Sequence, residues 1–165
     1  MKTLGVEDHA SALRRAFDAS FAESTSDDAA ATEDFLALRL AGHRYALRLA
    51  NVARLVTIPK IVPVPTSRPT ALGIAAVRGV LIAVHSLPAL LAHPLPEAAS
   101  HRWLVIVEAP DVLGLAFDEL DGFLRLPRGT DGALSLGGVA RPILDLNAVL
   151  ALVKNGGPPP ESGDR

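Results

Sequence analysis

The sequence contains no cysteine and few aromatic residues, with one Trp, one Tyr and five Phe among 165 residues. Without cysteine, the chain has no disulfide framework, no thiolate metal site and no thiol nucleophile. Its formal net charge is only −2, so it lacks the basic field that holds a nucleic-acid backbone. The single Trp103 is better explained by packing in the core or at an interface than by base stacking. We therefore expect no nucleic-acid partner.

Long apolar runs are also missing. The longest such stretch, LGIAAVRGVLIAV, is interrupted by Arg78 and is shorter than the roughly 20 residues that span a membrane. The first fifteen residues, MKTLGVEDHASALRR, carry charges every few positions and have no apolar core of a signal peptide. These features predict a cytoplasmic protein without membrane insertion.

Patterns typical of metal sites and catalytic centres are absent from the sequence as well. The five histidines show neither the i, i+4 pairing nor the neighbouring carboxylates of zinc sites; they are His9, His43, His85, His93 and His101. His85 and Ser86 are adjacent, and neighbours on a strand point to opposite faces, so they do not form a base and nucleophile. Asp118 and Glu119 are likewise neighbours without a third catalytic group. We expect no metal, no cofactor and no enzymatic activity.

The two ends of the chain differ in composition from its centre. Between residues 1 and 33, apolar residues recur every three or four positions, which predicts an amphipathic helix. This apolar stripe comprises Val6, Ala10, Leu13, Phe17 and Phe21. The small and acidic STSDDAAATED that follows predicts a flexible linker, and residues 155–165, NGGPPPESGDR, predict a disordered tail. The helix either packs on the body of the protein, frays, or docks a partner.

The central part, residues 34–154, changes to the period of two that is typical of strands. In FLALRL, Leu36, Leu38 and Leu40 face one side, which predicts a half-buried antiparallel strand. The next alternating set comprises Tyr45, Leu47 and Leu49. The apolar run RWLVIVE predicts a well-buried strand, and DLNAVLALV predicts a short helix with Asp145 as its N-cap.

An internal duplication is visible within this central part. YALRLANVARLVTIP (Tyr45–Pro59) aligns without a gap with LGLAFDELDGFLRLP (Leu113–Pro127) at an offset of 68. GVLIAVHSLPALL (Gly79–Leu91) aligns with GVARPILDLNAVL (Gly138–Leu150) at an offset of 59, with five identical residues. The difference of 68 − 59 = 9 residues lies in one loop, which is longer in the first copy.

The duplication predicts an all-β fold with a few short helices, built from two similar barrel-like halves over residues 34–95 and 96–154. Each half ends in a short helix, with Ser86 and Asp145 at equivalent N-cap positions. A barrel of roughly 55 residues buries too little apolar surface to be stable alone. We therefore expect the halves to share an interface, with a groove for a partner between them.

Four segments in this order resemble the CheW family of chemotaxis coupling proteins, over about two thirds of the chain. The segments are LRLAGHRYALRLANVARLVTIPKIVPVP, ALGIAAVRGVLIAV, LGLAFDELDGFLRLP and PILDLNAVL. In the family, the second segment usually reads glycine, apolar triplet, leucine, Arg-Gly, apolar run and Pro-Val-Val/Ile-Asp-Leu. Here Gly73, Arg78, Gly79 and Leu87 hold their places in that motif.

The resemblance implies two intertwined SH3-like five-stranded barrels and a non-enzymatic adaptor without cofactor. Its implied partners are the regulatory domain of a CheA-type histidine kinase and the hairpin tip of a chemoreceptor, to whose array the protein would be recruited. The implied partner-binding residues are Val52, Arg54, Arg78 and Gly79. Each of these residues also has a purely structural alternative. Val52 and Arg54 could belong to a solvated turn, and Arg78 could be a structural arginine bonded to carbonyls. Gly79 and its equivalent Gly138 could meet a requirement of the backbone.

Three positions depart from the family pattern. Arg54 stands where the family often has the glutamate of a Val-x-Glu-Ile/Val motif, while Ala83 and Ser86 replace its proline and aspartate. The reversed charge predicts a partner with a compensating acidic group. Two alternatives follow: a divergent adaptor that recruits or inhibits another signalling partner, or a small hydrolase or ligand-binding barrel centred on His85.

Overall fold

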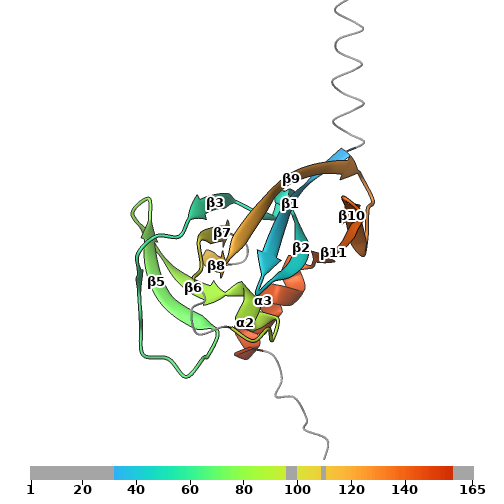
Figure 1. Cartoon of the computed structure of the whole chain (residues 1–165). Coiled ribbons are helices and arrows are strands. Elements are labelled where there is room, and N and C mark those ends of the chain that lie inside the picture. Colours follow the sequence, from blue (N-terminus) through green and yellow to red (C-terminus); the bar gives the residue numbers. More distant parts are fainter. Residues whose placement is uncertain (1–31, 96–99, 109–110, 158–165) are drawn as a thin grey trace, which may run out of the picture.

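A computed structural model describes residues 32–95, 100–108 and 111–157 of the chain. Most of the described residues lie in strands, which form two strongly curled sheets joined at a common seam (Figure 1). The five-stranded sheet contains β1 (Thr32–Leu40), β2 (His43–Arg48), β9 (Glu119–Pro127), β10 (Ala133–Leu136) and β11 (Val139–Leu144).

The six-stranded sheet takes its strands from the middle of the chain. Its members are β3 (Arg54–Thr57), β4 (Ile61–Val62), β5 (Ala71–Val77), β6 (Val80–Ser86), β7 (Trp103–Val107) and β8 (Leu113–Phe117). The helices are short, and they are η1 (Leu49–Asn51), α2 (Leu87–Leu90) and α3 (Leu146–Asn155). The predicted all-β, SH3-like fold is confirmed.

The two sheets have the same strand order once the duplication is applied. The order is β10-β11-β2-β1-β9 in one sheet and β5-β6-β8-β7-β3 in the other. The extra strand β4 lies at the edge of the second sheet, beside β5. In both sheets the single parallel pairing joins equivalent strands, β11 with β2 and β6 with β8. Each sheet therefore combines a hairpin from one sequence half with strands from the other, three in the five-stranded sheet and four in the six-stranded sheet. The sheets do not coincide with the halves.

The extra strand β4 comes from the loop that is nine residues longer in the first copy. This loop runs from Pro59 to Gly79, and β4 pairs with β5 through Ile61–Ala75 and Val62–Ile74. A Cβ at Gly73 would overlap the carbonyl oxygen of Val62, so only glycine allows this close approach.

Three hairpins close with two-residue turns in which both residues have positive φ. The turns are Ala41–Gly42 (49° and 84°), Arg78–Gly79 (50° and 82°) and Gly137–Gly138 (60° and 78°). This is the type I′ conformation, whose twist matches that of the flanking strands. The predicted backbone requirement at Gly79 and Gly138 is confirmed.

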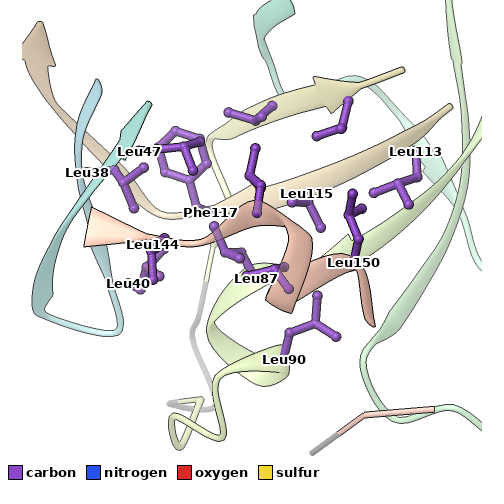
Figure 2. Close-up of a cluster of buried hydrophobic side chains, with 14 of the residues drawn as sticks. Leu38, Leu40, Leu47, Leu87, Leu90, Leu113, Leu115, Phe117, Leu144 and Leu150 are labelled. Atoms are coloured by element: carbon purple, nitrogen blue, oxygen red, sulfur yellow. The ribbon is translucent and has the colours of Figure 1, made fainter. Parts of the chain in front are cut away.

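The main core lies between the two sheets, where α2 and α3 also pack (Figure 2). Its largest side chains come from both sequence halves, among them Leu38, Leu47, Leu87, Leu115 and Phe117, which are all fully buried. Two smaller clusters fill the barrel interiors. One surrounds Ile82 and Leu104 in the six-stranded sheet, and the other surrounds Phe35 and Ala46 in the five-stranded sheet.

Strand β1 differs from its prediction as a half-buried strand. Its side chains do alternate, since Leu36, Leu38 and Leu40 join the main core and Phe35 joins the barrel interior. Both faces are buried, however, because a curled sheet covers its inner face while the second sheet covers the outer one. The predicted half-burial was therefore wrong.

The predicted boundaries need one correction at the start of the body. The body was expected to begin at residue 34, but Thr32 and Glu33 already pair with β9 as the first residues of β1. Both acidic residues form ion pairs across the sheet, Glu33 with Arg48 at 3.2 Å and Asp34 with Arg125 at 2.7 Å. The predicted N-terminal helix lies outside the described residues, as does the tail beyond residue 157.

Both predicted N-caps are confirmed. The Asp145 carboxylate accepts a hydrogen bond from the Asn147 amide at 2.9 Å, and the Ser86 hydroxyl accepts one from the Ala89 amide at 3.4 Å. Helix α3 ends at Gly156, whose left-handed conformation provides the usual C-cap. The buried strand predicted from RWLVIVE is β7, and all of its residues after Trp103 are buried.

Candidate functional site

A surface hollow of about 210 Å³ brings together two of the four residues predicted to bind partners. Arg54, at the start of β3, and Arg78, at the tip of the β5–β6 hairpin, both line it. Its remaining lining is apolar apart from one acidic residue and consists of Val77, Val80, Ile82, Ile106, Glu108 and Val112. This arginine-flanked hollow is an apolar depression with two cations and one carboxylate at its edge.

The backbone at Arg78 is in a conformation that side chains rarely adopt. Arg78 has φ of 50°, its side chain is exposed, and no hydrogen bond or ion pair is found for it within the described part of the chain. Arg78 is therefore not a structural arginine whose side chain bonds to backbone carbonyls. The guanidinium of Arg78 is thus left exposed beside the hollow.

Val52 lines a second hollow, which shares the lining residue Glu108 with the first. This hollow of about 370 Å³ lies between the β3 entry and helix α3. The Ala53 amide donates a hydrogen bond to the Ile106 carbonyl at 2.9 Å, which fixes Val52 and Arg54 on either side of this pairing. The fourth predicted residue, Gly79, forms the turn beside Arg78 and lines neither hollow.

The other barrel carries a buried ion network at the position equivalent to Ile82. By the offset of 59, Ile82 corresponds to Arg141, which is only 5% exposed. Its Nη2 donates to Asp121 at 2.7 Å, and Arg39 binds the same carboxylate at 3.1 Å. Burial would raise the pKa of Asp121, but the hydrogen bonds from Arg141 and Arg39 outweigh it and lower that pKa. This network was not predicted from the sequence, because Arg39, Asp121 and Arg141 are far apart in the chain.

The opposite face of the β5–β6 hairpin is an exposed apolar surface. Register places Ile74 opposite both Val62 and Ala83, and Ala76 opposite Leu81. Leu81 is 69% exposed and Val62 51% exposed. We call this set the outer apolar face; its members are Val62, Ile74, Ala76, Leu81 and Ala83. Because side chains alternate along a strand, one hairpin presents this face on one side and the arginine-flanked hollow on the other.

Comparison with known families shows to which family this chain belongs. The family model described as a CheW-like domain matches residues 34–142. The chain belongs to the CheW-like family. The solved scaffolding protein TtCheW from Thermoanaerobacter tengcongensis is similar in fold, with a TM-score of 0.59 and 19% identity over 68% of this chain and 88% of that one. No curated protein sequence matches the chain.

Membership of the CheW-like family goes with an adaptor-type role in chemotactic signalling and with a scaffold rather than an enzyme. In this CheW-like domain, the matched region includes both hollows except for the α3 residues of the second. It also includes every residue of the outer apolar face.

A serine, a histidine and an aspartate lie close together in the CheW-like domain, but their burial fits a structural role. Ser86 Oγ lies 2.9 Å from His101 Nε2, and Asp118 acts electrostatically on the same imidazole. Burial lowers the pKa of His101, while Asp118 opposes that shift. Ser86 is only 1% exposed and caps α2, and Asp118 Oδ2 accepts from the Ala41 amide at 2.7 Å. A substrate could not reach this hydroxyl, so the contacts tie the two sheets together.

His85 also has no geometry for catalysis. Its side chain is buried, and burial, followed by the charge of Arg68, lowers its pKa. It lines neither hollow described above. Among the described residues, no cluster of three or more metal-binding side chains is found, and no helix is long and apolar enough to cross a membrane.

Proposed function

We propose that this chain is a cytoplasmic adaptor that couples a chemoreceptor to a CheA-type histidine kinase in a receptor array. The observation that carries the proposal is the β5–β6 hairpin, which has the arginine-flanked hollow on one face and the outer apolar face on the other. An adaptor needs two surfaces that can be occupied together, because it acts by holding both partners at high effective concentration.

The receptor's hairpin tip is assigned to the arginine-flanked hollow. Exposed apolar side chains such as Val80 and Val112 would provide affinity, while Arg54 and Arg78 would set register and partner choice. Two arginines face one glutamate there, so the partner surface should be apolar with an acidic residue at its edge. This fits the reversal from the family's glutamate to Arg54.

The kinase's regulatory domain is assigned to the outer apolar face. This face contains no charged residue, and Leu81, near the hairpin turn, is one of the most exposed large apolar side chains among the described residues. Such patches on soluble domains typically mark protein–protein contacts. Val52 and Gly79 then act indirectly, Val52 in the adjoining hollow and Gly79 by shaping the turn that presents Arg78.

Substitutions at two equivalent turns test the receptor assignment. Arg78→Gly should weaken binding of a receptor hairpin fragment about tenfold or more, while raising the free energy of unfolding slightly, because glycine accepts positive φ. Ala41→Gly is the matched control, since Ala41 occupies the same turn position with φ of 49°. It should bring the same small gain in stability and leave binding unchanged.

Calorimetric titration with receptor fragments and with the kinase regulatory domain separates the two surfaces. Arg54→Glu should favour receptors with a basic facing residue, whereas Leu81→Asp should reduce kinase binding only. Binding of neither partner by the unaltered chain would contradict the coupling proposal. Receptor binding without kinase co-purification would favour instead a divergent adaptor that recruits another signalling partner.

A further inference from the structure

Strand β9 exposes a large aromatic side chain over a third hollow. Phe123 is 62% exposed, and with Leu49 and Leu124 it lines a depression of about 380 Å³. Asp34 and Arg125 form an ion pair at the edge of this hollow, with nitrogen–oxygen distances of 2.7 and 3.2 Å. We call it the Phe123 hollow. An apolar depression with a polar rim is typical of a surface that another segment covers.

The chain enters the body beside this hollow. Thr32 pairs with Pro127, and four residues further along β1, Leu36 pairs with Phe123. Four strand residues span about 13 Å. The 31 residues that precede β1 therefore join the body about 13 Å along the strand from Leu36, the residue that pairs with Phe123.

The apolar stripe in these 31 residues has the chemistry to cover the hollow. Its last two members, Phe17 and Phe21, are aromatic and lie nearest to β1. Eleven residues from Phe21 to Thr32 reach up to about 36 Å when extended, which is well beyond the distance to the hollow. Aromatic side chains pack favourably against one another in offset or edge-to-face pairs.

We propose that residues 6–21 dock on the same molecule, with Phe17 and Phe21 against Phe123 in the Phe123 hollow. The short tether gives the segment a millimolar effective concentration at this site. A second copy or another protein would have to compete with that concentration. The segment thereby leaves the arginine-flanked hollow and the outer apolar face to the partners.

Disulfide cross-linking tests this contact in the full chain, whose lack of cysteine provides a clean background. Ser20→Cys places a thiol beside Phe21, and Ala50→Cys places one on the exposed residue next to Leu49. Under mild oxidation, this pair should form an intramolecular disulfide whose yield does not depend on protein concentration. The control pair Ser20→Cys with Leu81→Cys, on the other sheet, should form it at least about tenfold more slowly.

Adding Phe123→Ser to the first pair should slow its cross-linking toward the control rate. Leu81→Ser removes an equally exposed apolar side chain elsewhere and should change nothing. Hydrogen exchange provides a second readout, since amides of residues 6–21 should lose protection in Phe123→Ser but not in Leu81→Ser. Equal cross-linking of both pairs, an intermolecular disulfide in the first pair, or unprotected amides in the unaltered chain would each overturn the proposal.

Discussion

At the residue scale, one pair of equivalent positions shows how two copies of a pattern acquire different roles. Ile82 fills the interior of one barrel, and Arg141 lies buried at the same position of the other. Its Nε and Nη1 have no partner within the described part of the chain, so Asp121 is its main compensation. The barrel with Ile82 has an open hollow beside it, whereas the barrel with Arg141 has an ion network.

Removing Asp121 should lower the free energy of unfolding much more than removing Arg141. Asp121→Ala leaves the Arg141 cation buried without a counter-ion and should lower the free energy of unfolding by about 3 kcal/mol. Arg141→Met should be nearly neutral, because it removes the unpartnered nitrogens and leaves Asp121 bound to Arg39. Urea unfolding measures both variants, with Asp34→Ala in the exposed pair as a control that changes little. Equal losses for Asp121→Ala and Arg141→Met would contradict this account.

At the element scale, the short helices depend on the residues that begin them. Helix α2 has only four residues and α3 has ten, so neither would be stable without packing and caps. The family's aspartate before α2 is Ser86 in this chain, and the serine keeps the capping hydrogen bond while also contacting His101. The departure from the family pattern therefore preserves the element.

Capping of α3 gives a prediction at this scale. Asp145→Ala should lower the free energy of unfolding by about 1 kcal/mol, because the Asn147 amide loses its acceptor. Asp145→Ser should restore most of this loss, since serine is also a good N-cap. Asp111→Ala, at an exposed position outside helices and strands, is the control for removing one negative charge. Chemical denaturation that finds alanine and serine equivalent at position 145 would argue against the cap.

At the scale of the whole molecule, the two barrels exchange strands. The β1–β2 hairpin joins β9, β10 and β11 from the other sequence half, while β7 and β8 join the sheet that begins at β3. The main core is correspondingly built from both halves, as Leu38 and Leu47 on one side meet Leu115 and Phe117 on the other (Figure 2). Neither half contains a complete sheet or a complete core.

The halves should therefore fold only together. A fragment of residues 32–95 and a fragment of residues 100–157 should each lack a cooperative thermal transition, and an equimolar mixture should regain strand content and the transition. Circular dichroism of the separate and mixed fragments, against the full chain, measures this. A cooperative transition in either fragment alone would show that its half is an independent domain.

The local features of this protein could be predicted from its amino-acid pattern. The period of two predicted strands, Asp145 and Ser86 predicted helix starts, and Gly79 and Gly138 predicted positions where the backbone requires glycine. Each depends on the residue and its near neighbours. The duplication predicted two similar units, and the nine-residue difference is where β4 was added.

Strand pairing and the contacts between distant side chains could be seen only in the tertiary structure. Equal spacing in two copies is compatible with separate or exchanged barrels, because strand pairing depends on burial across the whole chain. The approach of Arg54 to Arg78, the burial of both faces of β1, and the contact of Arg141 with Asp121 all follow from that exchange. Residues 24 or 20 positions apart in sequence become neighbours only when the curled sheets bring them together.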